Sequence, residues 1–423
     1  MTAQLQTSAP RRSARRSTHA PARRVAAAVF AAQGAAVAAV ATTVPAVQER
    51  LSLSPQLMTA LVVAMALSAG AGSFAGLAVI RRLGLVATMR AAVVAAAAAL
   101  LLIGWAPNQA TVAVSYGLFG AALGCIDVSA NTRAAAVERH YGRSIFASFY
   151  AAWSTAGVAA ALLTAGTARL AWPAEYTLTT QAALVLAFAL TIRSHTLPTP
   201  APVAASNDGT STVLGRGLWR KLAPFGFVLL VAYVIDSTVS AWSTLYLHQT
   251  LHTALSIAPL AYAAYQAGTI TGRACADRLV HRIGPAAVIR AATLLTAVAL
   301  AGLAAAPDWP YAVLAAACTG LGVSALAPLC LASAGRLRPG AAETVLARMN
   351  IFNYIGVLAG GAASGLLGST GHFRLAYAIP AALVLALLAT ARTFNHPAPR
   401  PRPHAAPADS LDRRRTCSTR DKT

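Results

Sequence analysis

Two carboxylates stand alone inside long apolar segments of this 423-residue chain. Asp127 lies in the apolar segment 111–132, and Asp236 lies near the middle of the segment 224–247. An ionised side chain in the hydrocarbon core of a membrane costs ~2.5 to 3.5 kcal/mol, so each carboxylate is a candidate functional group. Desolvation favours the neutral carboxyl, and contact with water or a cation favours the ionised one. We therefore predict proton-coupling roles for both; the alternative for each is a structural hydrogen bond to a neighbouring helix.

Polar residues accompany both aspartates at helical spacing. Asn131 follows Asp127 by four residues, while Tyr233 and Ser240 lie three residues before and four after Asp236. Such a stripe along one helix face points toward protein or water rather than lipid. Similar stripes in other segments complete the set that we expect to line a solute cavity or to hydrogen-bond between helices: Gln33, Asn131, Tyr150, Trp153, Tyr233, Ser240, Tyr262, Gln266, Asn350 and Asn353.

The segments that carry these residues are long enough to cross a membrane. The chain is 57% hydrophobic and only 11% charged, which is too little charge for a water-exposed surface of this size. Its apolar residues fall into blocks of about twenty, the length at which a helix crosses a ~30 Å hydrocarbon core. We predict an all-α membrane protein with twelve spans: 25–47, 57–80, 88–106, 111–132, 145–167, 176–192, 224–247, 257–277, 285–305, 311–334, 346–368 and 374–391.

The formal net charge of +22 comes from Lys and Arg that lie mostly in connections and tails. If the N-terminus is cytoplasmic, all of them except Arg50, Arg169 and Arg374 fall on the cytoplasmic side, as the positive-inside rule requires. We therefore predict a multi-pass plasma-membrane protein with both termini in the cytoplasm and no nucleic-acid partner. Composition divides the chain into disordered cytoplasmic tails at 1–24 and 392–423 and two six-helix bundles, 25–192 and 224–391, joined by a cytoplasmic linker at 193–223.

The two halves repeat a short motif two hundred residues apart. Arg82-Leu83-Gly84 follows the second span, and Arg282-Ile283-Gly284 follows the eighth. A pair of glycines four residues apart precedes each motif, at 72 and 76 and at 268 and 272. Close helix crossings at equivalent places suit a duplicated six-helix unit.

The chain lacks the sequence motifs of enzymes and metal sites. It contains no HExxH, no GxxxxGK[ST] and no GxSxG. His248 and His252 have i, i+4 spacing but no third ligand, so we interpret them as surface histidines. Four of the five cysteines (Cys125, Cys275, Cys318 and Cys330) lie in or beside apolar segments, so we interpret them as packed thiols rather than a disulfide framework. We expect no catalytic residue, no metal, no cofactor and no ATP-driven transport, and keep a membrane-embedded enzyme as a minor alternative.

The twelve spans, the central linker and the repeated Arg-x-Gly motif resemble the major facilitator superfamily over residues 25–391. Within it, VPAVQERLSLSPQ, GCIDVSANTRAAAVERHYGRS and WSTLYL are similar to a branch of bacterial permeases related to fucose–proton symporters. In that resemblance Asp127 and Asn131 match the acid and the asparagine of the fourth-span motif, where the acid is implicated in proton coupling. The family's cytoplasmic gate would comprise Arg82, Gly84, Asp277, Arg282 and Gly284.

The chain departs from the family pattern at two acidic positions. The residue before the first Arg-x-Gly motif is usually acidic but here is Arg81, and the first-span acid of fucose symporters is here Ala41. The resemblance implies a secondary active transporter that works by alternating access as a monomer, with the lipid bilayer, a small organic solute and protons as its partners. Proton-coupled uptake symport is the expected mode, and proton-coupled efflux of a drug-like or secreted metabolite is the alternative.

Overall fold

The computed structural model describes residues 20–141, 145–192, 216–337 and 342–394, and every regular element in these ranges is helical. The first half contains α2 (Ala20–Leu51), α3 (Pro55–Leu83), α4 (Leu85–Gly104), α5 (Gln109–Tyr141), α6 (Phe146–Arg169) and α7 (Ala174–Thr191). The second contains α8 (Arg216–Thr250), α9 (Leu260–Ile283), α10 (Pro285–Ala305), α11 (Trp309–Val323), α12 (Leu326–Arg336), α13 (Ala342–Ser369), α14 (Phe373–Leu385), α15 (Leu387–Thr390) and a short 3₁₀ turn, η2 (Ala391–Phe394).

The predicted twelve spans appear as helices, and ten of the described segments are long and apolar enough to cross a membrane. In that set α11 and α12 form one segment, as do α14 and α15. The two helices outside it are more polar: α7 carries Glu175, Gln181 and four threonines, and α9 carries Gln266 and several arginines. The all-α membrane fold is confirmed, and ten of the twelve predicted spans reach the length and hydropathy of a membrane-crossing helix among the described residues.

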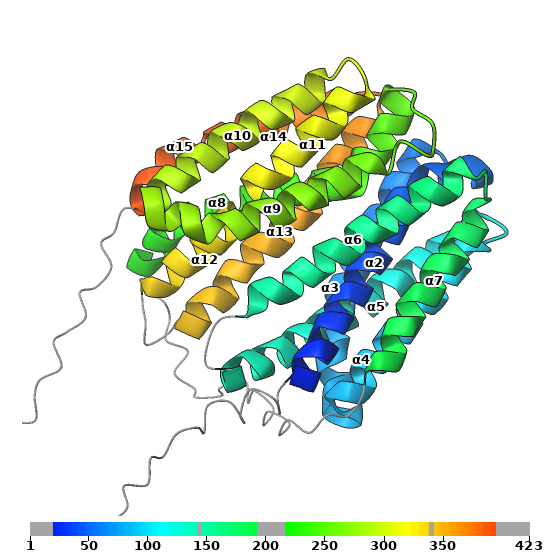
Figure 1. Ribbon diagram of the computed structural model, residues 1–423, viewed down its shortest axis with the longest axis horizontal. Helices are drawn as coiled ribbons and strands as arrows, with labels where there is room; N and C mark the ends of the chain where they lie inside the picture. Colours follow the sequence, from blue (N-terminus) through cyan, green and yellow to red (C-terminus); the bar gives the residue numbers. More distant parts are fainter. Residues whose placement is uncertain (1–19, 142–144, 193–215, 338–341, 395–423) are drawn as a thin grey trace, which may run out of the picture.

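The helices run side by side in two groups, and each group repeats the same pairing (Figure 1). In the first group α3 packs on α5, α2 on α6, and α4 on both α5 and α7. In the second group α9 packs on α11, α8 on α13, and α10 on both α11 and α14. The groups meet where α6 packs on α9, α3 on α13 and α2 on α8. The start of α2 and η2 lie at one end of the molecule, called the terminal end here; the opposite end is called the far end.

Glycines bring the helices of each pair into direct backbone contact. A Cβ built on Gly124 of α5 would overlap the Ala69 carbonyl of α3, and one built on Gly320 of α11 would overlap the Tyr265 carbonyl of α9. Small residues at such crossings allow close packing where lipid gives no hydrophobic drive for association. The glycines that the sequence analysis singled out in both halves lie at these two crossings.

The repeated Arg-x-Gly motif makes the same turn in both halves. Gly84 between α3 and α4 has φ +82°, and Gly284 between α9 and α10 has φ +80°. Each glycine donates its backbone N–H to a carbonyl four residues earlier, Ile80 and Val280, at 2.9 Å. Because side chains with a Cβ rarely adopt positive φ, glycine permits an abrupt reversal from one span to the next at both places.

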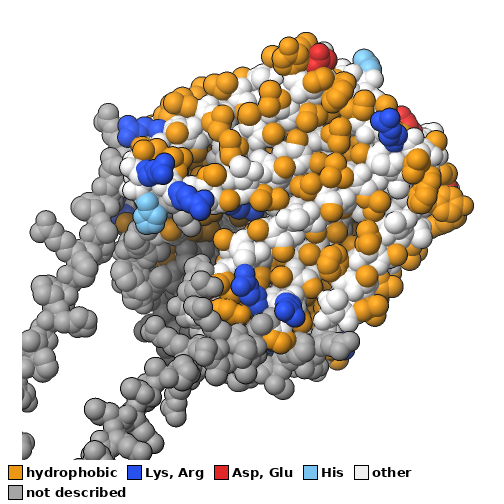
Figure 2. Space-filling view, viewed as in Figure 1, with side chains coloured by type: hydrophobic (Ala, Val, Ile, Leu, Met, Phe, Trp, Pro, Cys, Tyr) orange, Lys and Arg blue, Asp and Glu red, His pale blue; other side chains and the backbone are white. Residues whose placement is uncertain are grey.

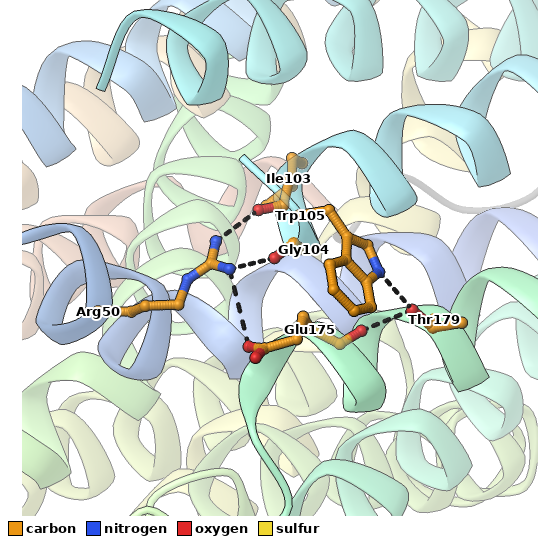
Figure 3. Close-up of polar contacts among 6 residues, drawn as sticks. All are labelled: Arg50, Ile103, Gly104, Trp105, Glu175 and Thr179. Carbon is orange, nitrogen blue, oxygen red and sulfur yellow. Dashed lines mark hydrogen bonds and ion pairs between the residues drawn. The ribbon is translucent and has the colours of Figure 1, made fainter. Parts of the chain in front are cut away.

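Two of the three arginines expected outside the cytoplasm cap the C-terminus of a neighbouring helix at the far end. Arg50, at the end of α2, donates to the carbonyls of Ile103 and Gly104 at the end of α4 and lies 3.7 Å from Glu175 of α7 (Figure 3). Arg374 of α14 donates to two carbonyls at the end of α10, at 2.8 and 3.1 Å. A guanidinium at a helix C-terminus satisfies unpaired carbonyls and complements the helix dipole, so these arginines have a structural reason to stand there.

The surface has the polarity of a membrane protein. Large apolar side chains such as Val114, Leu162 and Leu190 are exposed on the flanks of the helices. In the visible face most Lys and Arg lie toward the terminal end, whereas the visible Asp and Glu lie toward the far end (Figure 2). An apolar flank between polar ends is what a bilayer requires of a spanning bundle.

Candidate solute cavity

A cavity of about 380 Å³ lies between the two helix groups, roughly halfway along the helices. Its wall comes from α2, α3, α5 and α6 on one side and from α8, α9, α13 and the α11–α12 junction on the other. The polar and aromatic lining residues are Gln33, Ser73, Asp127, Tyr150, Trp153, Tyr233, Asp236, Tyr265, Gln266, Thr269, Arg273, Ser324, Asn353 and Tyr354.

Asp127 of α5 lines the cavity beside two side-chain amides. Asn131, one turn further along α5, donates to the Asp127 carboxylate at 3.1 Å and to its backbone carbonyl at 2.9 Å. Gln33 of α2 lines the same cavity. An amide can donate to a carboxylate or accept from a carboxylic acid, so these neighbours suit both protonation states.

Asp236 of α8 lines the opposite side of the cavity. The hydroxyl of Tyr265 on α9 donates to its carboxylate at 2.6 Å, a short charge-assisted bond. Tyr233 stands one turn before Asp236 and also lines the cavity. Each helix group therefore contributes one carboxylate to the same space.

Arg273 of α9 is a cavity residue that the sequence analysis counted with the cytoplasmic connection. Its guanidinium carbon lies 5.7 Å from the ring centroid of Tyr150 on α6, across the boundary between the two groups. Within the described residues its Nη1 atom is buried without a hydrogen-bond partner. Arg273 follows Gln266 by seven residues, two helical turns on one face, and this spacing could have revealed it.

The helix that begins at Trp309 breaks beside the cavity. α11 ends at Val323 and α12 starts at Leu326, and Val323, Ser324 and Pro328 all line the cavity. Pro328 has no N–H to donate to the Ser324 carbonyl, so the regular hydrogen-bond ladder is interrupted there. Irregular backbone at membrane depth is tolerated where it lines a cavity, which is its position here.

The cavity continues toward the terminal end. A second cavity of about 730 Å³ shares Ser73, Asp127 and Tyr150 with the first and extends along α5 to Asn131 and Thr132. The predicted gate residues Arg82 and Arg282 are exposed at this end. Neither has a hydrogen bond or an ion pair to another described residue, and the side chain of Asp277 lies outside the described part of the structure.

The far end is held closed by polar contacts between the two groups. His248 of α8 lies 2.7 Å from the Glu49 carboxylate of α2, and Gln249 donates to Gln48 at 3.1 Å. The other His248 nitrogen, Nδ1, lies 2.8 Å from the Thr253 carbonyl. His248 is therefore a contact between the two groups at the surface of the far end.

Most of the predicted cavity residues lie at one of the two cavities, but some do not. Tyr262 is buried between α9 and α6, where its hydroxyl lies against Gly157. Ser240 is one turn beyond Asp236, with a buried hydroxyl that has no partner among the described residues. The side chain of Asn350 lies outside the described part of the structure.

Comparisons with known proteins identify the family. The family model described as Major Facilitator Superfamily matches residues 26–286 and 225–419. An uncharacterized MFS-type transporter of Yersinia pestis is 27% identical over 288 residues, which is 68% of this chain and 73% of that protein. Members of this family are membrane permeases and not enzymes.

Solved structures share the fold. A crystal structure of the nucleoside transporter NupG has a TM-score of 0.70 at 14% identity and covers 88% of this chain and all of its own. The crystal structure of the E. coli fucose:proton symporter FucP has a TM-score of 0.57 at 15% identity, covering 90% and 100% of the two chains. The family model spans both helix groups and shows that the chain belongs to the major facilitator superfamily.

Proposed function

We propose that this secondary transporter takes up a small polar organic solute by proton-coupled symport through the cavity between its two six-helix bundles. The observation that carries the proposal is the setting of Asp127, which faces the cavity, accepts a hydrogen bond from the Asn131 amide and shares the cavity wall with Gln33. These amides satisfy the carboxylate and the carboxylic acid alike, so a proton can bind or leave without stranding a buried polar group.

Coupling follows from a change in the surroundings of Asp127. When the cavity opens to water the ionised form is favoured, and when the cavity closes around a solute the neutral form is favoured. A cycle that closes only with both proton and solute bound moves them together. Asp236, which already accepts from Tyr265, is assigned to solute binding or charge balance.

The open and closed ends support an alternating-access cycle. The far end is closed by Glu49 and His248, whereas the cavity continues toward the terminal end. We place the terminal end in the cytoplasm, because Lys and Arg gather there. The structure would then represent the state from which solute is released to the cell interior.

Proteoliposomes with an imposed pH gradient test the proposal. A panel of labelled sugars, nucleosides, organic acids and amino acids is screened for uptake with the acidic side at the far end. The proposal expects one class to accumulate against its gradient and uptake to collapse when a protonophore removes the pH difference. Solute movement opposite to the proton, or accumulation that ignores the pH gradient, would replace symport with antiport or uncoupled transport.

A further inference from the structure

Arg273 brings to the cavity a buried donor that the described residues leave without an acceptor. Its buried Nη1 atom has no hydrogen-bond partner among them, and no described carboxylate lies within ion-pair distance of it. A buried N–H donor without an acceptor is costly, because it has given up its hydrogen bonds to water and formed none in return. A ligand that brings an acceptor or a negative charge to this point would remove that cost.

The carboxylates in the cavity are already provided with donors. Asp236 accepts from Tyr265, and Asp127 accepts from Asn131. By contrast, the unpaired buried atoms among the cavity-lining residues are the Arg273 Nη1 and the Nε2 of Gln266, a side chain that is 1% exposed. Both are donors, so the cavity is complementary to a ligand that supplies acceptors.

The position of the guanidinium leaves it able to bind such a ligand. Its carbon lies 5.7 Å from the centroid of the Tyr150 ring, where the positive charge is stabilised by the aromatic system. A guanidinium beside an aromatic ring keeps its planar fork of N–H donors for a carboxylate, which it binds through two parallel hydrogen bonds. Because Tyr150 belongs to the first bundle and Arg273 to the second, the ligand would sit on the boundary that moves in the cycle.

The charges around Arg273 also permit a negative ligand. The titratable groups that share its cavity are Asp127, Tyr150, Tyr233, Asp236, Tyr265 and Tyr354. If Asp127 is protonated when the solute enters, the negative charge of Asp236 and the positive charge of Arg273 cancel, and the cavity has no net charge. This charge balance rests on the proposed function. The unpaired donors of Arg273 and Gln266 do not depend on it.

We infer that the transported solute carries a carboxylate, or an equivalent planar anionic group, and that Arg273 binds it. The neighbouring side chains Tyr150, Trp153 and Tyr233 supply apolar faces for the rest of the molecule, and Gln266 supplies a second donor. Arg273 is thus a residue that determines substrate class, separate from the proton site at Asp127.

Binding to the purified full-length chain in lipid nanodiscs tests this inference without any proton gradient. Each probe acid is compared with a neutral counterpart of similar size: gluconate with sorbitol, benzoate with benzyl alcohol, and lactate with propanediol. We expect at least one acid to bind about tenfold or more tightly than its counterpart, as the loss of a charge-assisted pair implies. Arg273→Gln should abolish that preference, and Arg273→Lys should retain part of it because it keeps the charge but not the fork.

The matched control is Arg278→Gln, which removes an exposed arginine from the same helix and should leave the preference unchanged. Equal binding of acids and neutral counterparts, no binding of any acid at millimolar concentration, or an undiminished preference in Arg273→Gln would each overturn the inference. A preference that depends on Arg273, together with uptake that ignores the pH gradient, would uphold the anion site and refute proton symport instead.

Discussion

Removing the Glu49 carboxylate should open the far end of the transporter. Glu49 and His248 join the two bundles at 2.7 Å, and their side chains are 57% and 20% exposed. A partly exposed side-chain contact of this kind contributes ~0.5 to 1 kcal/mol when formed. Because Glu49→Gln weakens only states in which this end is closed, the ratio of open to closed states should rise roughly two- to fivefold.

The change can be measured with a single cysteine at Ser240, which lies one turn beyond Asp236 on the same helix stripe. In a background without native cysteines, a membrane-impermeant thiol reagent added on the Glu49 side should react about two to five times faster in Glu49→Gln. Glu175→Gln is the matched control, because Glu175 pairs with Arg50 at the same end but within the first bundle. An unchanged rate in Glu49→Gln, or the same acceleration in Glu175→Gln, would refute the reasoning.

Three further predictions follow from the packing, the second carboxylate and the topology. Gly124→Val should lower the free energy of unfolding by ~1 to 3 kcal/mol through overlap with α3, measured as a lower melting temperature in detergent, whereas Gly166→Val has open space around it and should not. Asp236→Asn should raise the KM for solute more than it changes the dependence of uptake on pH; an unchanged KM with a lost pH response would exchange the roles of the two aspartates. Single cysteines at Asn108, beyond α4, and at Ser206, which lies outside the described residues, should label from opposite sides of the membrane, and labelling of both from one side would contradict the placement of the bundles.

The sequence predicted what depends on local spacing. The helical segments follow from apolar blocks, and the contact between Asp127 and Asn131 follows from a separation of four residues on one helix. The turns at Gly84 and Gly284 follow from a repeated motif whose glycine is required by positive φ.

The contacts that define the site were not predictable in the same way. Tyr265 reaches Asp236 across 29 residues and His248 reaches Glu49 across 199, so both depend on how helices are arranged in space. Arg273 was missed for a different reason: an arginine near the cytoplasmic end of a span is what the positive-inside rule expects, and that rule does not consider which way the side chain faces. Tyr262 shared the polar stripe of α9 but packs against α6, because a stripe of polar residues cannot separate cavity lining from helix contact.

The central claim is that Asp127 carries the coupling proton, and the most direct measurement compares accumulation with exchange in Asp127→Asn. Asparagine keeps the size of the side chain and resembles the neutral acid, so it should preserve the contacts with Gln33 and Asn131 but cannot release a proton. In proteoliposomes the variant should exchange labelled for unlabelled solute at a rate close to the unmodified protein, yet fail to concentrate solute when a pH gradient is imposed. Asp308→Asn, which changes a carboxylate that caps α11 far from the cavity, should do both normally. Accumulation in Asp127→Asn with the pH dependence of the unmodified protein would contradict the account and leave Asp127 as a structural hydrogen-bond partner.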